Sequence, residues 1–170
     1  EAAISFARFA LNSFSEVDIL VNNAGIFIPG DLCDEPDGQL EAMLQLNLIA
    51  PYAITRIIAP KMKQQQSGHI FNICSVASLK AYPMGGSYSI SKYALLGFSE
   101  NLRQELMHHK IKVTAICPGA TDSRSWADAD VPKDRIMPAY DIAEILWTSY
   151  KMSGNTNLET IVMRPQLGDL

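Results

Sequence analysis

The chain has 170 residues, of which 48% are hydrophobic, and a formal net charge of -4 at pH 7. This length suits a single domain, 1–170, and the apolar content is enough for a substantial core. The mildly negative charge, without any basic block, argues against nucleic acid as a partner. No apolar run approaches the ~20 residues that a membrane-spanning helix needs, so we expect no membrane partner either.

The chain contains three cysteines, Cys33, Cys74 and Cys117, which are scattered and lack the spacing of metal ligands. Cys74 and Cys117 lie in apolar, strand-like runs, where a free cysteine behaves as a small core residue. We therefore expect no metal site. No signal-peptide pattern is present, and a reducing cytoplasm is the default location.

Apolar residues recur with alternating helix-like and strand-like periods, which is typical of βα units. In chain order, the predicted elements are a helix over 2–14, a strand over 17–21, a helix over 39–66, a strand over 69–74, a helix over 88–109, a strand over 111–117, a helix from about 138 and a strand over 158–163. Pro51 predicts a bend within the second helix. Asp141 lies near the expected N-cap of the last helix.

The first predicted strand ends in the sequence Asn22-Asn23-Ala24-Gly25. Gly25 and Ala24 have little or no side chain, so a ligand can approach the backbone closely at this turn. The asparagine side chains can brace the sheet and the loop that follows. An ordinary strand-ending turn can have the same sequence, so the tetrapeptide alone leaves both interpretations open.

Tyr88 and Lys92 are candidates for proton-transfer chemistry. Positions i and i+4 of a helix lie on one face, so the Lys92 ammonium can sit beside the Tyr88 phenol. A nearby cation favours phenolate, and we expect it to lower the pKa of Tyr88 from its usual value near 10. A tyrosine tuned in this way can exchange a proton with a carbonyl or an alcohol near neutral pH. Ser75 directly follows the strand 69–74, at the carboxyl edge where active sites of parallel α/β sheets lie.

The segment NICSVASLKAYPMGGSYSISKYALLGFSENLRQEL, residues 72–106, resembles the catalytic region of the short-chain dehydrogenases/reductases. Their pattern has a serine at a strand end and Tyr-x-x-x-Lys about thirteen residues later, which here are Ser75, Tyr88 and Lys92. The resemblance implies a Rossmann-like, doubly wound parallel sheet and an NAD- or NADP-dependent oxidoreductase with a small-molecule carbonyl or alcohol substrate. It implies that Tyr88 is the acid/base, that Ser75 hydrogen-bonds the substrate oxygen, and that Lys92 holds the nicotinamide ribose.

The same resemblance implies roles for residues outside this segment. Asn47, within residues 46–51, matches an asparagine that bends its helix and anchors a water relay to Lys92 as the fourth catalytic member. The implied cofactor-binding positions are Asn23, Ala24, Gly25, Tyr88, Lys92, Pro118, Gly119, Thr121 and Ser123. Thr121 and Ser123 stand where the family usually has an aliphatic residue and a threonine, which leaves their particular contact to the nicotinamide amide open.

Residues 124–137 correspond to the family's mobile substrate loop, in which Trp126 is a candidate to close over substrate. Tyr82, Met84 and Met137 add to a partly apolar pocket. The family's Gly-rich phosphate-binding turn is absent from these 170 residues, and Glu1 stands within a helix-like pattern. We therefore expect an N-terminally truncated member that lacks the first strands and matches the later two-thirds of the family's length.

A different class of function stays open, namely a catalytically silent Rossmann-fold fragment or binding protein. Fluorescence titration with NADH and NADPH distinguishes a cofactor-binding protein from an inert one. A carbonyl epimerase or dehydratase also has Tyr-x-x-x-Lys, but Asn47, Ser75 and the Asn-Asn-Ala-Gly turn favour the oxidoreductases.

The helices over 39–66 and 88–109 carry more apolar surface than one sheet face can cover, which predicts a second buried face. In the resembled family these two helices pair across a two-fold axis, so we expect a homodimer or homotetramer. Phe98 and Leu102 are the expected outer-face positions. Scattered surface apolar residues would give the same pattern.

Overall fold

The computed structural model describes residues 1–123 and 131–169. Its helices and strands are α1 (Ala2–Ser13), β1 (Ile19–Asn22), α2 (Gln39–Leu44), the π-helical turn η1 (Gln45–Ile49), α3 (Ala50–Gln65), β2 (Gly68–Ile73), η2 (Val76–Ser78), α4 (Gly86–Leu106), η3 (Met107–His109), β3 (Ile111–Pro118), η5 (Lys133–Arg135), α5 (Ala139–Lys151) and β4 (Thr160–Met163). The predicted helices and strands are present in the predicted order, with ends that differ by a few residues.

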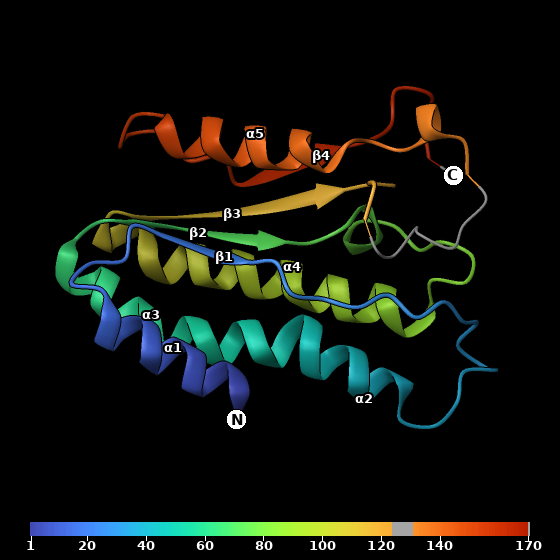
Figure 1. Ribbon diagram of the computed structural model, residues 1–170, viewed down its shortest axis with the longest axis horizontal. Helices are drawn as coiled ribbons and strands as arrows, with labels where there is room; N and C mark the ends of the chain where they lie inside the picture. Colours follow the sequence, from blue (N-terminus) through green and yellow to red (C-terminus); the bar gives the residue numbers. More distant parts are fainter. Residues whose placement is uncertain (124–130, 170) are drawn as a thin grey trace.

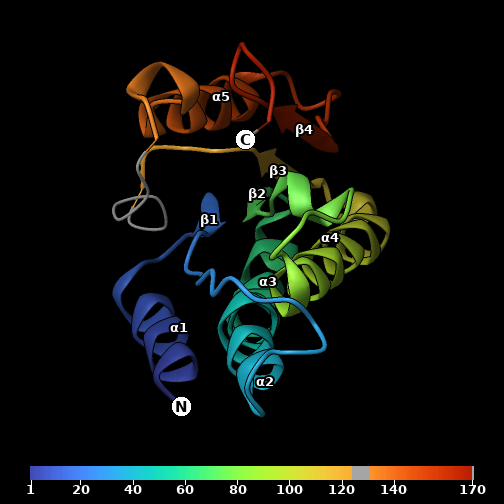
Figure 2. The same ribbon diagram turned by 90° about the vertical axis from the view of Figure 1, so that its right-hand side faces the viewer.

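The four strands form one parallel sheet in the order β1-β2-β3-β4. Figures 1 and 2 show α1, α3 and α4 on one face of the sheet and α5 on the other. This confirms the predicted Rossmann-like α/β arrangement, with four parallel strands in the described residues. Each strand lies beside the one before it in the same direction across the sheet, but α5 lies on the opposite face from α3 and α4. The β3–α5–β4 crossover therefore has the opposite hand to the two crossovers before it.

The strand register brings the carboxyl ends of the strands to one edge. Asn22, the last residue of β1, pairs with Asn72 of β2, and Ile73 pairs with Ile116 of β3. The segments that follow β1, β2 and β3 therefore leave the sheet side by side. This edge is where an α/β protein of this type forms its ligand site.

The main core lies between the sheet and helices α1, α3 and α4. Its buried members are Ala7, Ile58, Ala59, Met62, Ile70, Leu102, Leu106, Ile111 and Val113. A polar chain is buried in the same layer, where Asn22 Nδ2 donates to Asn72 Oδ1 at 2.8 Å and Asn72 Nδ2 donates to Ser99 Oγ at 2.8 Å. Asn22 thus links β1 to β2, in keeping with the bracing role expected of the asparagines in this turn.

The helical stretch Gln39–Gln65 is interrupted by the π-helical turn Gln45–Ile49 rather than by Pro51. Pro51 sits in the first turn of α3, where its missing N–H is tolerated. The stretch is 27 residues long and, by length and composition alone, apolar enough to cross a membrane, which the sequence analysis did not anticipate. In the fold, Ile58 and Met62 of this helix belong to the main core, so its apolar character is that of a core-packing helix.

Asp141 lies in the first turn of α5, three residues after the N-cap Pro138, so the prediction that it lies near the N-cap is confirmed, and its charge suits the helix dipole. The expected outer face of α4 is wrong. Leu102 is a buried member of the main core, and Phe98 is half-buried with its ring 5.6 Å from that of Tyr52, so neither lies on an outer face of α4. The periodicity of apolar residues could not distinguish the outer face from the core-facing side, because the helices over 39–66 and 88–109 are apolar on several faces.

His69 is buried within β2, with 2% of its surface exposed. Its ring stacks on that of Phe71 with centroids 3.8 Å apart, and its Nε2 lies 2.8 Å from Thr114 Oγ1. Burial, and then the charge of Lys112, lower its pKa from 6.5 to about 3. His69 is therefore neutral near pH 7, with a structural role inside the sheet.

We predict that His69 makes the fold sensitive to mild acid. Below pH 6.5 the unfolded chain protonates this histidine and the folded chain does not, so the free energy of unfolding falls as the pH falls towards about 3. Between about pH 7 and about pH 5.5 the loss is about 1 kcal/mol. Urea unfolding at these two pH values should show this loss in the wild type and not in His69→Gln. Equal losses in both proteins would contradict the prediction.

Candidate active site

A cleft of about 930 Å³ opens at the carboxyl edge of the sheet, between the loops after β1, β2 and β3 and the helices α4 and α5. The sequence-predicted residues that line it are Asn23, Gly25, Ser75, Tyr88, Lys92, Pro118, Gly119, Thr121 and Ser123. Asn47 is buried behind the cleft wall, and Ala24 is exposed without lining the cleft. The fold thus brings nearly all of the predicted positions to one place.

Ser75 lies two residues after the end of β2 and is the N-cap of the short helix η2. Its Oγ accepts a hydrogen bond from Ala77 N at 3.1 Å, and Ser78 Oγ accepts one from Ser75 N at 3.1 Å. This reciprocal pair is a capping box, which satisfies backbone donors that the helix start would otherwise leave unpaired. It also restrains the Ser75 side chain at the edge of the cleft.

Tyr88 and Lys92 lie one turn apart on α4. Lys92 Nζ is 5.8 Å from the centroid of the Tyr88 ring and donates a hydrogen bond to Ile73 O at 2.9 Å. The ring of Phe27 packs edge-on against that of Tyr88, with centroids 4.8 Å apart. Both side chains are thus restrained by groups from the ends of β1 and β2.

The pKa of Tyr88 is raised, which contradicts the sequence-based expectation. Burial disfavours the phenolate and outweighs the hydrogen bond with Ser75, which acts in the opposite direction. Burial also lowers the pKa of Lys92. The expectation that Lys92 lowers the pKa of Tyr88 is therefore wrong for this site, because loss of water around both groups dominates. Tyr88 is a neutral phenol near pH 7.

Asn47 lies in the π-helical turn and is fully buried. Its Oδ1 accepts from Ile26 N at 2.8 Å, and its Nδ2 donates to Ile26 O at 2.9 Å and to Ser91 Oγ at 2.9 Å. A Cβ added at Gly25 would lie 3.0 Å from Asn47 Oδ1 and 3.5 Å from Lys92 Nζ. Gly25 therefore lets the Asn47 amide and the Lys92 ammonium approach the turn after β1.

The predicted cofactor-binding positions come from the strands on either side of β2. Asn23 and Gly25 follow β1, and residues 118–123 follow β3. Thr121 Oγ1 donates back to Gly119 O at 2.9 Å, so the Thr121 hydroxyl is engaged within its own turn. The backbone of these small residues is what the cleft exposes to a ligand.

Glu35 is a residue that the sequence analysis missed. Its carboxylate accepts hydrogen bonds from Ser87 N, at 2.9 Å, and from Ser87 Oγ, at the start of α4. These bonds lower the pKa of Glu35, because both favour its charged form. A Cβ on Gly86 would lie 2.0 Å from Glu35 Oε1 and 2.6 Å from Gly30 O. The sequence could have indicated this contact through the glycines at 30 and 86, because the absence of their side chains lets the loop around Glu35 touch the helix that carries Tyr88.

The C-terminal residues reach one wall of the cleft through a contact that the sequence analysis also missed. Tyr82 OH donates to Asp169 Oδ2 at 2.6 Å and accepts from Arg164 Nη1 at 3.0 Å. Arg164 Nη1 also donates to Asp169 Oδ1 at 2.6 Å. Tyr82 and Asp169 are 87 positions apart, so no local sequence pattern could have indicated the pair.

The apolar part of the cleft differs from the one predicted. Tyr82 lines the cleft, whereas Met84 is exposed, Met137 is buried, and Trp126 lies outside the described residues. The missing apolar wall comes from α5, through Ala139, Ile142, Ala143 and Leu146. These residues are spaced so that they share one face of α5, and this spacing in the sequence could have indicated an apolar wall.

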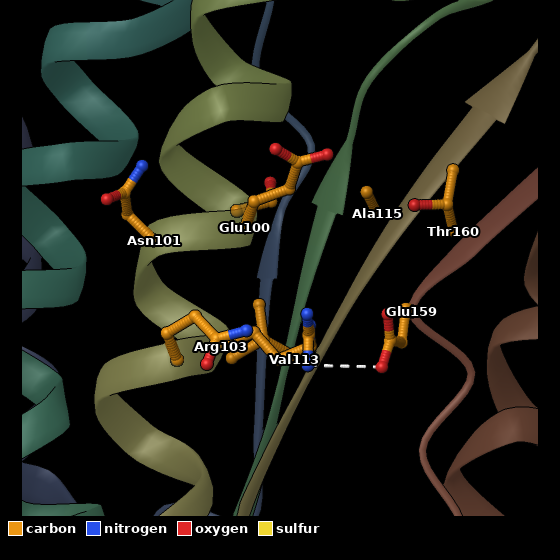
Figure 3. Close-up of a pocket in the computed structure, with 9 residues that line it drawn as sticks. Glu100, Asn101, Arg103, Val113, Ala115, Glu159 and Thr160 are labelled. Atoms are coloured by element: carbon orange, nitrogen blue, oxygen red, sulfur yellow. Dashed lines mark ion pairs between the residues drawn. The ribbon is translucent and has the colours of Figure 1, made fainter.

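A second hollow, of about 290 Å³, lies between α4 and the β3–β4 side of the sheet (Figure 3). Val113 and Ala115 of β3 line it, and Arg103 of α4 pairs with Glu159 at 3.1 Å across it. None of the sequence-predicted site residues lines this hollow. The larger cleft is therefore the candidate active site within the part of the chain that the structure describes.

Residues 1–133 match the model of the short chain dehydrogenase family. The chain is 32% identical over 158 residues to a sepiapterin reductase of Chlorobaculum tepidum, a match that covers 92% of this chain and 65% of that protein. The chain thus spans 65% of the length of this curated relative.

Two solved structures are similar over nearly the whole chain. A metagenomic short-chain oxidoreductase in complex with NADP is 28% identical with a TM-score of 0.79, covering 97% of this chain and 69% of that one. Serine dehydrogenase from Escherichia coli is 26% identical with a TM-score of 0.85, covering 99% of this chain and 74% of that one.

We predict that Gly86→Ala destabilises the fold, because its methyl group would overlap Glu35 and the Gly30 carbonyl. Overpacking of this kind costs about 1–3 kcal/mol. Gly97→Ala, in the same helix, is the matched control, since a Cβ there meets nothing within 4 Å and alanine favours helix by about 0.5–1 kcal/mol. Urea unfolding of the two variants should give shifts of opposite sign. A Gly86→Ala protein as stable as Gly97→Ala would show that the contact yields without cost.

Proposed function

Because the chain belongs to the short-chain dehydrogenase family, we propose that the protein is an oxidoreductase that transfers a hydride between NAD or NADP and a carbonyl or alcohol substrate. The observation that carries the proposal is the convergence of Ser75, Tyr88 and Lys92 on one cleft at the carboxyl edge of a parallel sheet. These residues provide a hydroxyl donor, an acid/base and a cation within one site.

Tyr88 is proposed as the acid that protonates the substrate oxygen. Its raised pKa keeps the phenol protonated near pH 7, which is the form that can donate to a carbonyl oxygen. Ser75, already hydrogen-bonded to Tyr88, would hold the same oxygen and stabilise the negative charge that develops there. Lys92 would orient the nicotinamide ribose through the Nζ protons that Ile73 O does not accept.

The cleft fits a nicotinamide cofactor in size and in lining. Its volume of about 930 Å³ lies in the range of ligand pockets, and small residues at Gly25 and Gly119 leave backbone accessible on both sides of β2. When bound, the reduced cofactor supplies the hydride. Asn23, Gly25, Pro118, Gly119, Thr121 and Ser123 are the residues that would contact it.

Asn47 is proposed as the fourth member of the catalytic set. Its amide holds the Ile26 backbone and Ser91, and so supports both the turn after β1 and the helix that carries Tyr88 and Lys92. The π-helical turn that contains it is a distortion of a kind often found at functional sites. In the proposal, this region anchors the water through which Lys92 exchanges protons with solvent.

The substrate side of the cleft favours a carbonyl compound with apolar substituents. Ile142 and Leu146 of α5 give the cleft an apolar wall, and the Phe27 ring packs against Tyr88, whereas Ser75 and Tyr88 provide polar groups. A few polar groups in an otherwise apolar cleft fix the orientation of a ligand.

We predict that, in a full-length version that includes the phosphate-binding turn, Tyr88→Phe lowers turnover by about 10²–10⁴, because it removes the proposed acid and leaves the cleft shape almost unchanged. Turnover is measured as loss of NADH or NADPH absorbance with a panel of aldehydes and ketones. Tyr140→Phe, on the exposed part of α5 outside the cleft lining, is the control and should leave turnover unchanged. Near-normal turnover in Tyr88→Phe would contradict the assignment of the acid.

The same experiments separate the oxidoreductase from a silent binding protein. Titration of wild type and Tyr88→Phe with NADH and NADPH, followed by fluorescence, should show similar cofactor binding in both. Cofactor binding without turnover of any carbonyl compound in the wild type would favour the binding protein.

The proposal includes a homodimer or homotetramer. Ile49 and Tyr52 at the start of α3, together with Ile90 and Tyr93 of α4, are exposed by 41–46% of their surface. The Tyr52 ring lies 5.6 Å from that of Phe98, which shows that the two helices are neighbours. These four exposed apolar residues on neighbouring helical segments support a second copy of the chain as the partner, since large exposed apolar areas mark interaction sites.

We predict that Tyr93→Glu dissociates the assembly, because a carboxylate buried without a partner at the interface is strongly unfavourable. Light scattering at micromolar concentration should give a smaller mass for Tyr93→Glu than for the wild type. Leu32→Glu places the same charge on an exposed residue outside the patch and should keep the wild-type mass. A monomeric wild type, or a dimeric Tyr93→Glu, would contradict this part of the proposal.

A further inference from the structure

Cys74 and Cys117 lie side by side at the carboxyl ends of β2 and β3. Ile73 pairs with Ile116 in the parallel register, and Cys74 N donates to Ile116 O at 2.7 Å, so the next residue of each strand is Cys74 and Cys117. Side chains at matching positions of neighbouring strands point to the same face. Both cysteines belong to one buried cluster with Leu95 and Ala115.

The spacing of neighbouring strands suits a disulfide. Adjacent strands lie about 4.8 Å apart, which falls within the Cα separation of roughly 4.4–6.8 Å that disulfides span. Both cysteines are free thiols, and the third cysteine, Cys33, is exposed and belongs to neither strand. The strand register therefore places the two thiols next to each other.

The two thiols have different acidities. The interaction with the Cys117 thiol lowers the pKa of Cys74, although burial of Cys74 acts in the opposite direction, and the same interaction raises the pKa of Cys117. The charge of Lys92 further favours a Cys74 thiolate. A thiolate is the nucleophilic form of cysteine, so Cys74 is the more reactive member of the pair.

Cys74 is also the accessible member. It lines the cleft, although only 2% of its surface is exposed, whereas Cys117 is fully buried behind it. This arrangement, with the more acidic thiol at the cleft and a second thiol behind it, is that of a pair that is able to form a disulfide.

We propose that Cys74 and Cys117 form a redox-active dithiol that peroxide converts to a disulfide at the floor of the cleft. The Cys74 sulfur attacks one peroxide oxygen, the O–O bond breaks, and the leaving hydroxide takes up a proton to become water. Cys74 is then a sulfenic acid. The Cys117 sulfur attacks the Cys74 sulfur, the S–S bond forms, and the S–O bond breaks, with the hydroxyl group leaving as a second water with the Cys117 proton. Two thiols are oxidised and one peroxide is reduced to two waters.

The disulfide would join the two strands directly before the cleft. Ser75 follows Cys74, and Pro118 follows Cys117, so the bond would tie together the starting points of two cleft walls. It would also remove the thiolate that lies near Lys92. Once the disulfide has formed, it affects the residues that line the cleft, and the oxidant itself need not stay bound.

Peptide mapping tests the proposal with a chemical readout that does not depend on the proposed function. Trypsin places the three cysteines in separate peptides, 9–56 for Cys33, 64–80 for Cys74 and 113–124 for Cys117. The folded protein is treated with hydrogen peroxide, blocked with iodoacetamide, digested and analysed by mass spectrometry. We expect a linked peptide 64–80/113–124 that has lost two hydrogens and disappears with dithiothreitol.

Two variants make the result specific. Cys33→Ser should give the same linked peptide, and Cys117→Ser should give none while Cys74 advances to the sulfinic acid. If Cys117→Ser does not fold, the wild type alone decides, through a linked peptide that forms in buffer and not after unfolding in urea. Recovery of Cys74 and Cys117 as alkylated thiols after peroxide treatment would overturn the proposal, as would stable sulfinic acid on Cys74 in the wild type.

Discussion

The site depends on one buried side chain, the amide of Asn47. Its oxygen and nitrogen are fully used, on both backbone groups of Ile26 and on the Ser91 hydroxyl. An amide buried in this way is stable only when each polar atom has its partner, so the turn after β1 and the helix α4 are held in one relative position. Gly25 makes this possible, because a side chain there would press on the Asn47 oxygen. The positions of Tyr88 and Lys92 follow from this contact.

Burial then decides the charge state of the groups that Asn47 positions. The pKa of Tyr88 rises and that of Lys92 falls, since each loses water that would stabilise its charged form. The hydrogen bond from Lys92 to the Ile73 carbonyl partly replaces that water. The prediction that Lys92 four residues away lowers the pKa of Tyr88 fails, because it considers only the two charged groups and omits the water that burial removes from them. A ligand that brings its own polar groups into the cleft would change this balance, which is a property that a proton-transfer site needs.

The fold, and the side of the cleft with Ser75, Tyr88 and Lys92, could be predicted because both depend on residues that are close together in the sequence. The periodicity of apolar residues and the turn residues indicated the strands and helices. The spacing of the candidate residues indicated the site, because Ser75 follows a strand and Tyr88 and Lys92 are four residues apart on one helix. Glu35 was missed because its partner, Ser87, is 52 residues away. Leu102 was placed on the wrong face because α4 is apolar on several sides, so the period alone could not choose the one that meets the core.

The apolar wall of the cleft has a different physical origin. It comes from α5, which reaches the cleft only because the crossover after β3 changes to the other face of the sheet. Two long-range contacts hold this side, Gly119 N to Met163 O at 2.8 Å and the Tyr82–Asp169 hydrogen bond. None of these contacts involves the groups that Asn47 positions. Residues on the α5 side can therefore change without moving Ser75, Tyr88 or Lys92, so the two sides of the cleft can vary independently.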